Sequence, residues 1–212
     1  MNDAVESWGN VEVYRGYSMG RSLLARLTAR FDVVDWKGQP YSNIFNHEFR
    51  VFKFEHGTDW IFESLPGKGV RFTPLWKLDH SKKVAYYYLY KESVSQEDAK
   101  TMFTSCYELD GQSYNHWALV WLYIHLGLRR NRRPLIELKE YSRRYICSAL
   151  VEKLNHVMGV VRGNVQTMTP SKSILLDKGY PASVLFGVNR SLLERKRHLT
   201  DEDILVDITG GA

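Results

Sequence analysis

Alternation of apolar and polar positions through the first half of the chain predicts an antiparallel β-sheet. Two such runs, residues 45–54 and 60–65, flank a polar, glycine-containing segment at residues 55–59, and this pattern is typical of a β-hairpin. If the turn centres near His56 and Gly57, facing residues have numbers that sum to about 112. Shorter runs of the same kind predict further strands at residues 11–14, 31–36, 70–74, 84–90 and 180–188.

Apolar residues at spacings of three and four predict helices between and after these strands. Ser18 is expected to cap a helix that continues through Arg30. A capping-box pattern, Ser95-Gln-Glu-Asp98, predicts a helix that runs to about Leu109. Further helices are expected at residues 115–126, from Cys147 through Leu154, and from Thr169-Pro170 onward.

The composition indicates one folded domain. The 212 residues are enough for a full hydrophobic core, and 44% hydrophobic with 13% aromatic residues is typical of a globular protein. We expect this domain over residues 11–188, after a leader at residues 1–10 and before a charged tail at residues 189–212. The net charge is +5, but no nucleic-acid-binding motif accompanies the arginine clusters, so nucleic acid is not an expected partner. The oligomeric state is left open.

The cysteine count and the apolar runs indicate a compartment. Cys106 and Cys147 are too few for a disulfide framework. The first residues are polar and acidic, so we expect no secretory signal there. The longest apolar run, residues 117–128, contains His125 and is shorter than the ~18 residues of a membrane span. These features predict a cytoplasmic protein. No Cys and His spacing suits zinc, and we expect neither a metal nor a cofactor.

A candidate nucleophile stands where one of the predicted helices begins. The thiol of Cys147 would face the positive end of the helix macrodipole and unpaired backbone N–H groups. Both favour the thiolate, which is the reactive form of cysteine. The alternative is a buried structural cysteine, since Cys is among the most often buried residues. Cys106, beside Phe103 and Tyr107 on an amphipathic helix, is expected to be of that structural kind.

The predicted hairpin supplies the base that a cysteine nucleophile needs. In the register described above, His47 lies beside Glu63 or Leu65. An imidazole held by a carboxylate on a rigid hairpin is the arrangement of a general base. We therefore expect His47, Glu63 and Cys147 to meet, with the thiol within hydrogen-bonding reach of the imidazole.

The order of these residues along the chain, His, Glu and then Cys, resembles that of the circularly permuted papain-like cysteine amidase and peptidase family (YaeF/YiiX-like, in the permuted NlpC superfamily). Its members are related to NlpC-type peptidases and to lecithin:retinol acyltransferases. The local patterns that carry the resemblance, over residues 11–188, are Cys147-Ser-Ala-Leu-Val151, the strand from His47 followed by Glu63 and Gly69-Val70, Gly111-Gln-Ser-Tyr-Asn115, and Thr169-Pro170. Ala149 stands where the family often has Glu, and Asn115 where it often has Asp.

The resemblance implies an α+β, circularly permuted papain-like fold, in which a small antiparallel sheet packs against the helix that carries the catalytic Cys. It implies a cysteine hydrolase that cleaves an amide through an acyl-thioester, with Cys147 as nucleophile, His47 as base and Glu63 as orienting residue. Tyr114 and Ser148 are expected at the oxyanion and substrate-binding site. The substrate is expected to be a peptide, a peptidoglycan stem peptide or an isopeptide.

Two alternatives stay open. A lipid acyltransferase or thioesterase of the same fold would need an apolar acyl groove near Cys147. A non-catalytic binding or structural module would keep the fold without keeping the three residues in register. Reactivity of Cys147 toward an electrophile separates an enzyme from a scaffold. Hydrolysis of peptide amides rather than acyl lipids separates the two enzymes.

Overall fold

The fold is known from a computed structural model of the chain. The described residues leave out residues 1–8 of the leader expected at residues 1–10, the arginine cluster at residues 129–133 and the tail expected at residues 189–212. The structure describes residues 9–20, 22, 25, 26, 28, 32, 34–36, 39–41, 45–81, 84–117, 120, 124, 144–160, 165, 168–177 and 184–188.

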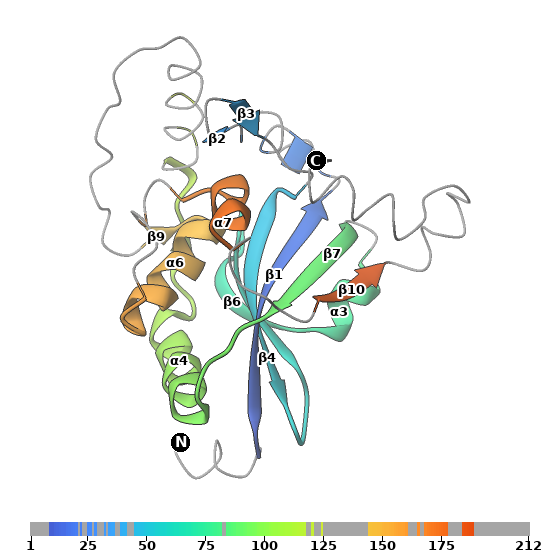
Figure 1. Ribbon diagram of the computed structural model, residues 1–212, viewed down its shortest axis with the longest axis vertical. Helices are drawn as coiled ribbons and strands as arrows, with labels where there is room; N and C mark the ends of the chain where they lie inside the picture. The colour runs from blue at the N-terminus through green and yellow to red at the C-terminus, as the bar shows by residue number, and fades with distance from the viewer. Residues whose placement is uncertain are drawn as a thin grey trace.

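The described chain folds around a six-stranded antiparallel sheet (Figure 1). The strand order across the sheet is β10-β7-β1-β4-β5-β6, so the first strand along the chain lies between later ones. The strands are β1 (Val11–Gly20), β4 (His47–Phe54), β5 (Trp60–Leu65), β6 (Gly69–Pro74), β7 (Val84–Lys91) and β10 (Val184–Val188). With the helices described below, this is an α+β protein, as the sequence pattern predicts.

Strand β1 is longer than its local sequence predicts, and the expected helix cap at Ser18 is wrong. Ser18 lies inside the strand, with His47 as its Cα partner in β4 and Tyr87 as its Cα partner in β7. Pairing along both edges of β1 outweighs the local preference of this short segment. Gly16 does not end the strand. It leaves room for the ring of Phe49, because a Cβ there would lie 2.0 Å from that ring.

The β4–β5 hairpin has the predicted register. Its paired residues are Arg50↔Phe62, Val51↔Ile61 and Phe52↔Trp60. At the turn, Gly57 has a φ of +113°, in the region that favours glycine. The β5–β6 hairpin follows directly and places Glu63 opposite Arg71. The two hairpins together form one half of the sheet.

Three helices lie on one side of the sheet and a shorter one, α3, lies on the other (Figure 1). The helices are α3 (Trp76–Asp79), α4 (Gln96–Leu109), α6 (Cys147–Val157) and α7 (Pro170–Asp177). Two predicted caps form, because the Ser95 side chain accepts a hydrogen bond from the Asp98 N–H and Thr169 accepts one from the Lys172 N–H. Helices α4 and α7 therefore begin where the sequence predicts. The helix that carries Cys147 also begins at the predicted residue.

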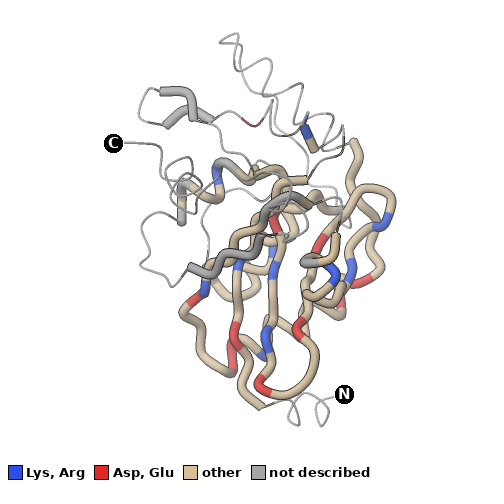
Figure 2. Tube along the Cα trace, turned by 90° about the vertical axis from the view of Figure 1, so that its right-hand side faces the viewer, with Lys and Arg blue, Asp and Glu red and all other residues tan. Residues whose placement is uncertain are grey.

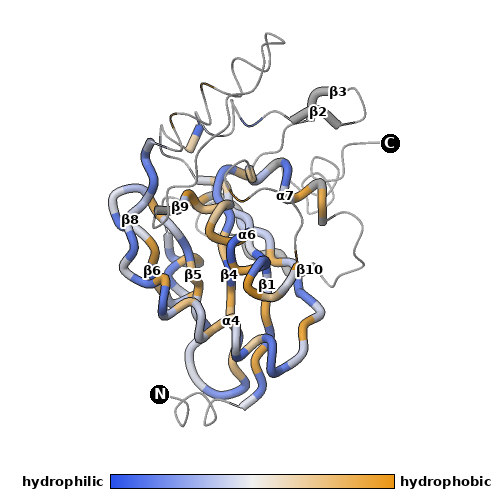
Figure 3. The backbone as a smooth tube through the Cα atoms, turned by 90° about the vertical axis from the view of Figure 1, so that its left-hand side faces the viewer, coloured by the Kyte–Doolittle hydropathy of each residue, from blue (hydrophilic) through white to orange (hydrophobic). Residues whose placement is uncertain are grey.

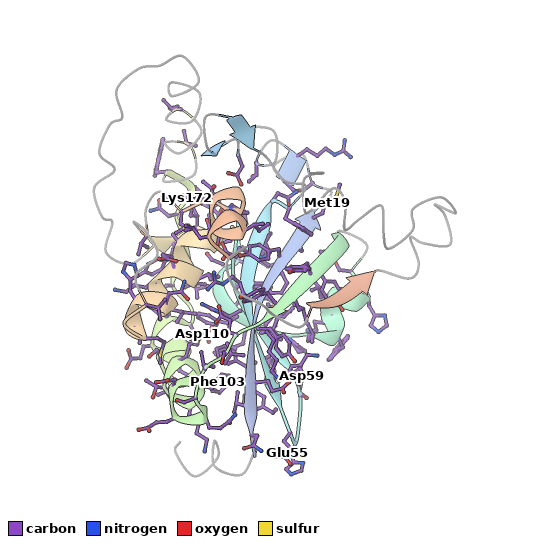
Figure 4. All side chains as sticks on the ribbon, viewed as in Figure 1. Met19, Glu55, Asp59, Phe103, Asp110 and Lys172 are labelled. Carbon is purple, nitrogen blue, oxygen red and sulfur yellow. The ribbon has the colours of Figure 1, made fainter. Side chains whose placement is uncertain are left out.

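Apolar clusters on both faces of the sheet hold these helices. On one face, Phe52 of β4 packs with Phe103 of α4 and Leu150 of α6. Figure 4 shows side chains, Phe103 among them, between α4 and the strands. On the other face, Phe49 packs with Leu78 of α3. Burying one such side chain contributes about 1.5–3 kcal/mol, so core packing ties α6 to the sheet.

Two short strand pairs complete the described fold, and the sequence pattern predicts only one of their strands, which lies within the run expected at residues 31–36. β2 (Val34–Trp36) pairs antiparallel with β3 (Gln39–Tyr41). β8 (Ser113–Tyr114) pairs parallel with β9 (Arg144–Tyr145), which leads directly into α6 (Figure 3). In the part of the chain that the structure describes, no helix combines the length and the apolar character that crossing a membrane requires.

Candidate active site

Three elements bring His47, Glu63 and Cys147 together. His47 is the first residue of β4, Glu63 lies near the end of β5, and Cys147 is the first residue of α6. The last paired residues of the β4–β5 ladder are Arg50 and Phe62, so His47 and Glu63 lie beyond the pairing. The candidate site therefore forms where the two strands of the hairpin no longer bond to each other.

The site lies at the end of the hairpin away from its turn. In Figure 4, Glu55 at the turn and Lys172 of α7 mark opposite ends of the sheet. The hydroxyl of Ser64 in β5 donates to the backbone carbonyl of Tyr145 at 2.7 Å. This bond ties the residues just before α6 to the end of β5, and so places the start of the helix beside the open end of the hairpin.

The imidazole of His47 lies between a carboxylate and a thiol. Its Nε2 is 3.0 Å from Glu63 Oε2, and its side chain also hydrogen-bonds with that of Cys147. Since Nε2 faces Glu63, Nδ1 is the nitrogen left to serve Cys147. Burial lowers the pKa of His47, but hydrogen bonds and electrostatic interactions with Cys147 and Glu63 outweigh it and raise the pKa to about 10. The imidazole is therefore protonated at neutral pH.

Glu63 is held by further residues that the sequence analysis misses. Thr73 Oγ1 donates to Glu63 Oε1 at 2.8 Å, and Arg71 Nε donates to Thr73 Oγ1 at 3.0 Å. Burial raises the pKa of Glu63, but His47, Thr73 and Arg71 together hold it below its ordinary value. A register argument finds these partners, because a turn centred on Gly67 places Glu63 opposite Arg71 and puts Thr73 on the same face of β6.

The two cysteines have different surroundings. Cys147 begins α6 and is 8% exposed, whereas Cys106 lies within α4 in the core and is 0% exposed. Burial raises the pKa of Cys106 well above its ordinary value, which agrees with a structural thiol. At the start of α6 the N-cap residue is Ile146, which makes no side-chain capping bond. The N–H groups of the first turn therefore receive no acceptor from their N-cap side chain.

One face of the His47 ring packs against an aromatic side chain. The rings of His47 and Phe49 stack with their centroids 5.7 Å apart and their planes at 29°. Phe49 is buried and fills the space over Gly16 of the neighbouring strand. The orientation of His47 is thus set by a carboxylate at its edge and by a ring on its face.

Two further predicted site residues lie close to Cys147 and make contacts of their own. The Ser148 hydroxyl is buried and donates to a backbone carbonyl just before α7 at 2.7 Å. Tyr114 of β8 is the Cα partner of Tyr145, two residues before Cys147. The ring of Tyr114 is buried and packs against His116 with centroids 4.9 Å apart. Their roles in oxyanion or substrate binding stay predictions.

A buried cluster of charged side chains joins α6 to the sheet. Arg15 and Arg50, which are Cα partners on β1 and β4, both reach the Glu92 carboxylate and the side-chain oxygen of Asn155 in α6. Asn155 donates in turn to Glu152 at 2.8 Å. Figure 2 shows residues of both charges along the strands themselves. Because each buried charge needs its partners, the cluster fixes α6, and with it the position of the thiol, relative to the sheet.

Within the described residues, no group of three or more His, Cys, Asp and Glu side chains is arranged to hold a metal ion. Comparison with known proteins adds no relative. No model of a known protein family matches the sequence, and no curated protein matches it either.

Proposed function

We propose that this protein is a cysteine hydrolase that cleaves an amide bond through an acyl-thioester intermediate. The observation that carries the proposal is the hydrogen-bonded chain from Glu63 through His47 to Cys147, in which the pKa of the imidazole is raised to about 10. A protonated imidazole beside a cysteine favours the thiolate, which is the nucleophilic form.

The three side chains divide the reaction between them. The thiolate of Cys147 attacks the carbonyl carbon, and the electron pair of the C=O bond moves onto oxygen. The imidazolium of His47 gives its proton to the leaving nitrogen as the C–N bond breaks, which releases an amine and leaves an acyl-thioester. The neutral imidazole then takes a proton from water, whose oxygen attacks the thioester. Breaking the C–S bond releases the carboxylic acid and restores the ion pair, while Glu63 holds the imidazole throughout.

The start of α6 supplies a donor for the oxyanion that forms during each attack. The backbone N–H of Cys147 lies in the first turn, where helical N–H groups have no intrahelical partner. The side chain of Tyr114 is proposed as a second donor. Loss of one such donor lowers the turnover rate by about 10²–10³. Tyr114→Phe should therefore reduce turnover while the thermal unfolding of the protein stays close to that of the wild type.

The position of the three residues supports a circularly permuted papain-like architecture as the finer fold. The proposed base and its orienting residue come from a sheet, and the nucleophile comes from the start of a helix that follows the sheet strands along the chain. On the resemblance described above, peptide and isopeptide amides, including the stem peptides of peptidoglycan, are the proposed substrate class.

The first test needs no substrate. Iodoacetamide at neutral pH should alkylate Cys147 much faster than Cys106, because thiolate fraction and exposure control the rate. Mass-spectrometric peptide mapping measures both rates in one sample. His47→Ala should slow the labelling of Cys147 and leave that of Cys106 unchanged. Faster labelling of Cys106 would contradict the proposal and favour a non-catalytic module.

A second test assigns the roles through turnover of fluorogenic peptide amides. Cys147→Ala and His47→Ala should abolish hydrolysis, because these groups take part in making and breaking bonds. Glu63→Gln should leave partial activity, because Glu63 orients the imidazole and stabilises its charge. Each tenfold loss corresponds to about 1.4 kcal/mol of barrier. Equal turnover by the Glu63→Gln variant and the wild type would remove Glu63 from the mechanism.

Exposed apolar side chains favour one second candidate, an acyltransferase or thioesterase that acts on acyl lipids. Trp117, Val120 and Ile124 are 67%, 45% and 44% exposed and recur at helical spacing. They follow Tyr114, whose strand pairs with the residues that lead into α6. An exposed apolar surface of this kind suits an acyl chain. Hydrolysis of acyl thioesters or phospholipids in preference to peptide amides would select this candidate.

A further inference from the structure

The carboxylate of Glu63 has a different buried partner on each of its oxygens. Oε2 lies 3.0 Å from His47 Nε2, and Oε1 accepts a hydrogen bond from Thr73 Oγ1 at 2.8 Å. Glu63 and Thr73 are 7% and 8% exposed. A buried carboxylate with both oxygens bonded cannot rotate freely, since rotation breaks hydrogen bonds that are costly to lose at a buried site.

The Thr73 hydroxyl, which donates to Glu63, also accepts a hydrogen bond from a third residue. Arg71, on the same face of β6, places its Nε 3.0 Å from Thr73 Oγ1. A guanidinium can only donate and an ionised carboxylate can only accept, so the hydroxyl oxygen accepts from Arg71 while its hydrogen bonds to Glu63. A threonine hydroxyl is otherwise free to donate or accept. Here it does both, accepting from its neighbour on β6 and donating to the carboxylate.

We propose that Thr73 and Arg71 are positioning residues for the candidate active site, which keep Glu63 ionised and aimed at His47 Nε2 so that Nδ1 faces Cys147. This inference rests on the proposed function. Neither residue touches the reacting atoms, and both act through Glu63. A series of contacts runs from Arg71 through Thr73, Glu63 and His47 to Cys147, across β6, β5, β4 and α6. Two adjacent hairpins and a helix therefore set one thiol in place.

Protonation of Glu63 provides a readout that a purely structural role would not move. The titratable groups around Glu63 in the described residues are His47 from β4, Arg71 from β6 and, through His47, Cys147 from α6. Burial raises the pKa of Glu63, whereas His47, Thr73 and Arg71 lower it. Removing the Thr73 donor should therefore raise the pH at which Glu63 takes up a proton, and with it the pH at which His47 loses its anionic partner.

The experiment is the pH profile of Cys147 alkylation in the full chain, measured with iodoacetamide. Thr73→Val keeps the shape of the side chain and removes the donor. We expect it to slow alkylation at least about threefold in mildly acidic solution and to move the acidic limb of the profile to higher pH. Thr73→Ser, which keeps the hydroxyl, should restore both the rate and the limb. Arg71→Met should move the limb in the same direction by a smaller amount, and it provides a second measurement if Thr73→Val does not fold.

Two controls separate the outcomes. Thr104→Val changes an exposed threonine of α4 and should leave the profile unchanged. In a Glu63→Gln background, Thr73→Val should no longer move the acidic limb, because no carboxylate remains to titrate. If wild-type Cys147 is no more reactive than Cys106, the proposed function fails. If it is reactive and Thr73→Val has the wild-type rate and profile, only the positioning role is overturned.

Discussion

His47 keeps its proton because the side chains of Cys147 and Glu63 both raise its pKa, and each can be removed separately. Burial alone would favour the neutral imidazole, and hydrogen bonds with Cys147 and Glu63 reverse that preference. The cysteine is the larger of the two raising influences. The charge on the imidazole is therefore a property of the assembled site, and its titration reports on whether the thiol is in place.

We predict that Cys147→Ala lowers the pKa of His47 well below about 10, because the substitution removes the largest raising influence and leaves burial unchanged. NMR titration of the histidine ring signals measures this directly. Glu63→Gln should also lower the pKa, by a smaller amount. An unchanged midpoint in the Cys147→Ala variant would show that the thiol does not interact with the imidazole.

Gly16 provides a second prediction, since an added Cβ would lie 2.0 Å from Phe49 Cε2. The ring must move to make room, and this ring stacks on His47. We expect Gly16→Ala to cost about 1–3 kcal/mol in the free energy of unfolding, measured in urea, and to slow the alkylation of Cys147. Combining Gly16→Ala with Phe49→Leu should cost less than the two single changes added together, if the clash is the cause.

At the scale of elements, α6 is held to the sheet by charges as well as by apolar packing. Arg50 is fully buried and bonds to both Glu92 and Asn155. We predict that Arg50→Met destabilises the protein by about 3–5 kcal/mol, because it leaves buried partners without their countercharge. Lys53→Met on the same strand is the control. Lys53 lies 5.1 Å from the ring centroid of Tyr14 and is partly exposed, so its loss should cost no more than about 1 kcal/mol. If Arg50→Met and Lys53→Met lowered the free energy of unfolding by the same amount, α6 would not depend on the cluster of buried charges around Arg50.

The elements that the sequence predicts are those with a strong local signal. The first hairpin has a glycine turn between two alternating runs, so both its register and the meeting of His47 with Glu63 follow from residue numbers. The helix from Cys147 follows from the spacing of its apolar residues. By contrast, β1 continues past Gly16 because strands on both sides pair with it. The ten residues of β1 carry no local pattern that predicts these partner strands.

The parts of the candidate site that the sequence does not predict depend on contacts between distant segments. The β8–β9 pair, which leads into α6, joins Tyr114 to Tyr145 across a separation that no local pattern spans. Arg15 and Asn155, which help to place α6, are 140 residues apart. Thr73 could have been found, since the second hairpin also has a glycine turn. A register count of that kind identifies the partners of one residue, but it does not show which of them is buried.

For the whole molecule, the buried charges make stability depend on pH. Burial raises the pKa of Glu92, but Arg50 and Arg15 outweigh it and lower the pKa from 4.5 to about 2. A carboxylate with a lowered folded-state pKa stabilises the fold above its unfolded-state pKa, and this contribution is lost as the pH falls toward 2. We predict a loss of about 3 kcal/mol between pH 4.5 and pH 2, measured by urea unfolding at each pH.

Glu92→Gln is the matched variant for this prediction. It should be less stable than the wild type at neutral pH and should lose less stability on acidification, because one titrating group is gone. Glu63, whose pKa is also lowered, contributes in the same direction in both proteins. Parallel pH curves for Glu92→Gln and the wild type would show that the arginines do not depend on this carboxylate.

The strand order has a consequence for synthesis on the ribosome. β1 lies inside the sheet but is made before both of its neighbours, β4 on one edge and β7 on the other. Arg15 meets Asn155 only after 140 more residues have been added, which takes about 7–28 s at ordinary elongation rates. Tyr17 meets Ser173 later still, 156 residues on. Until β4 and β7 are made, β1 therefore has unpaired edges to which a chaperone can bind, and Arg15 lacks the Glu92 carboxylate until that residue follows β7. Because Cys147 follows His47 and Glu63 along the chain, the proposed base and its orienting residue have already been made when the thiol is added.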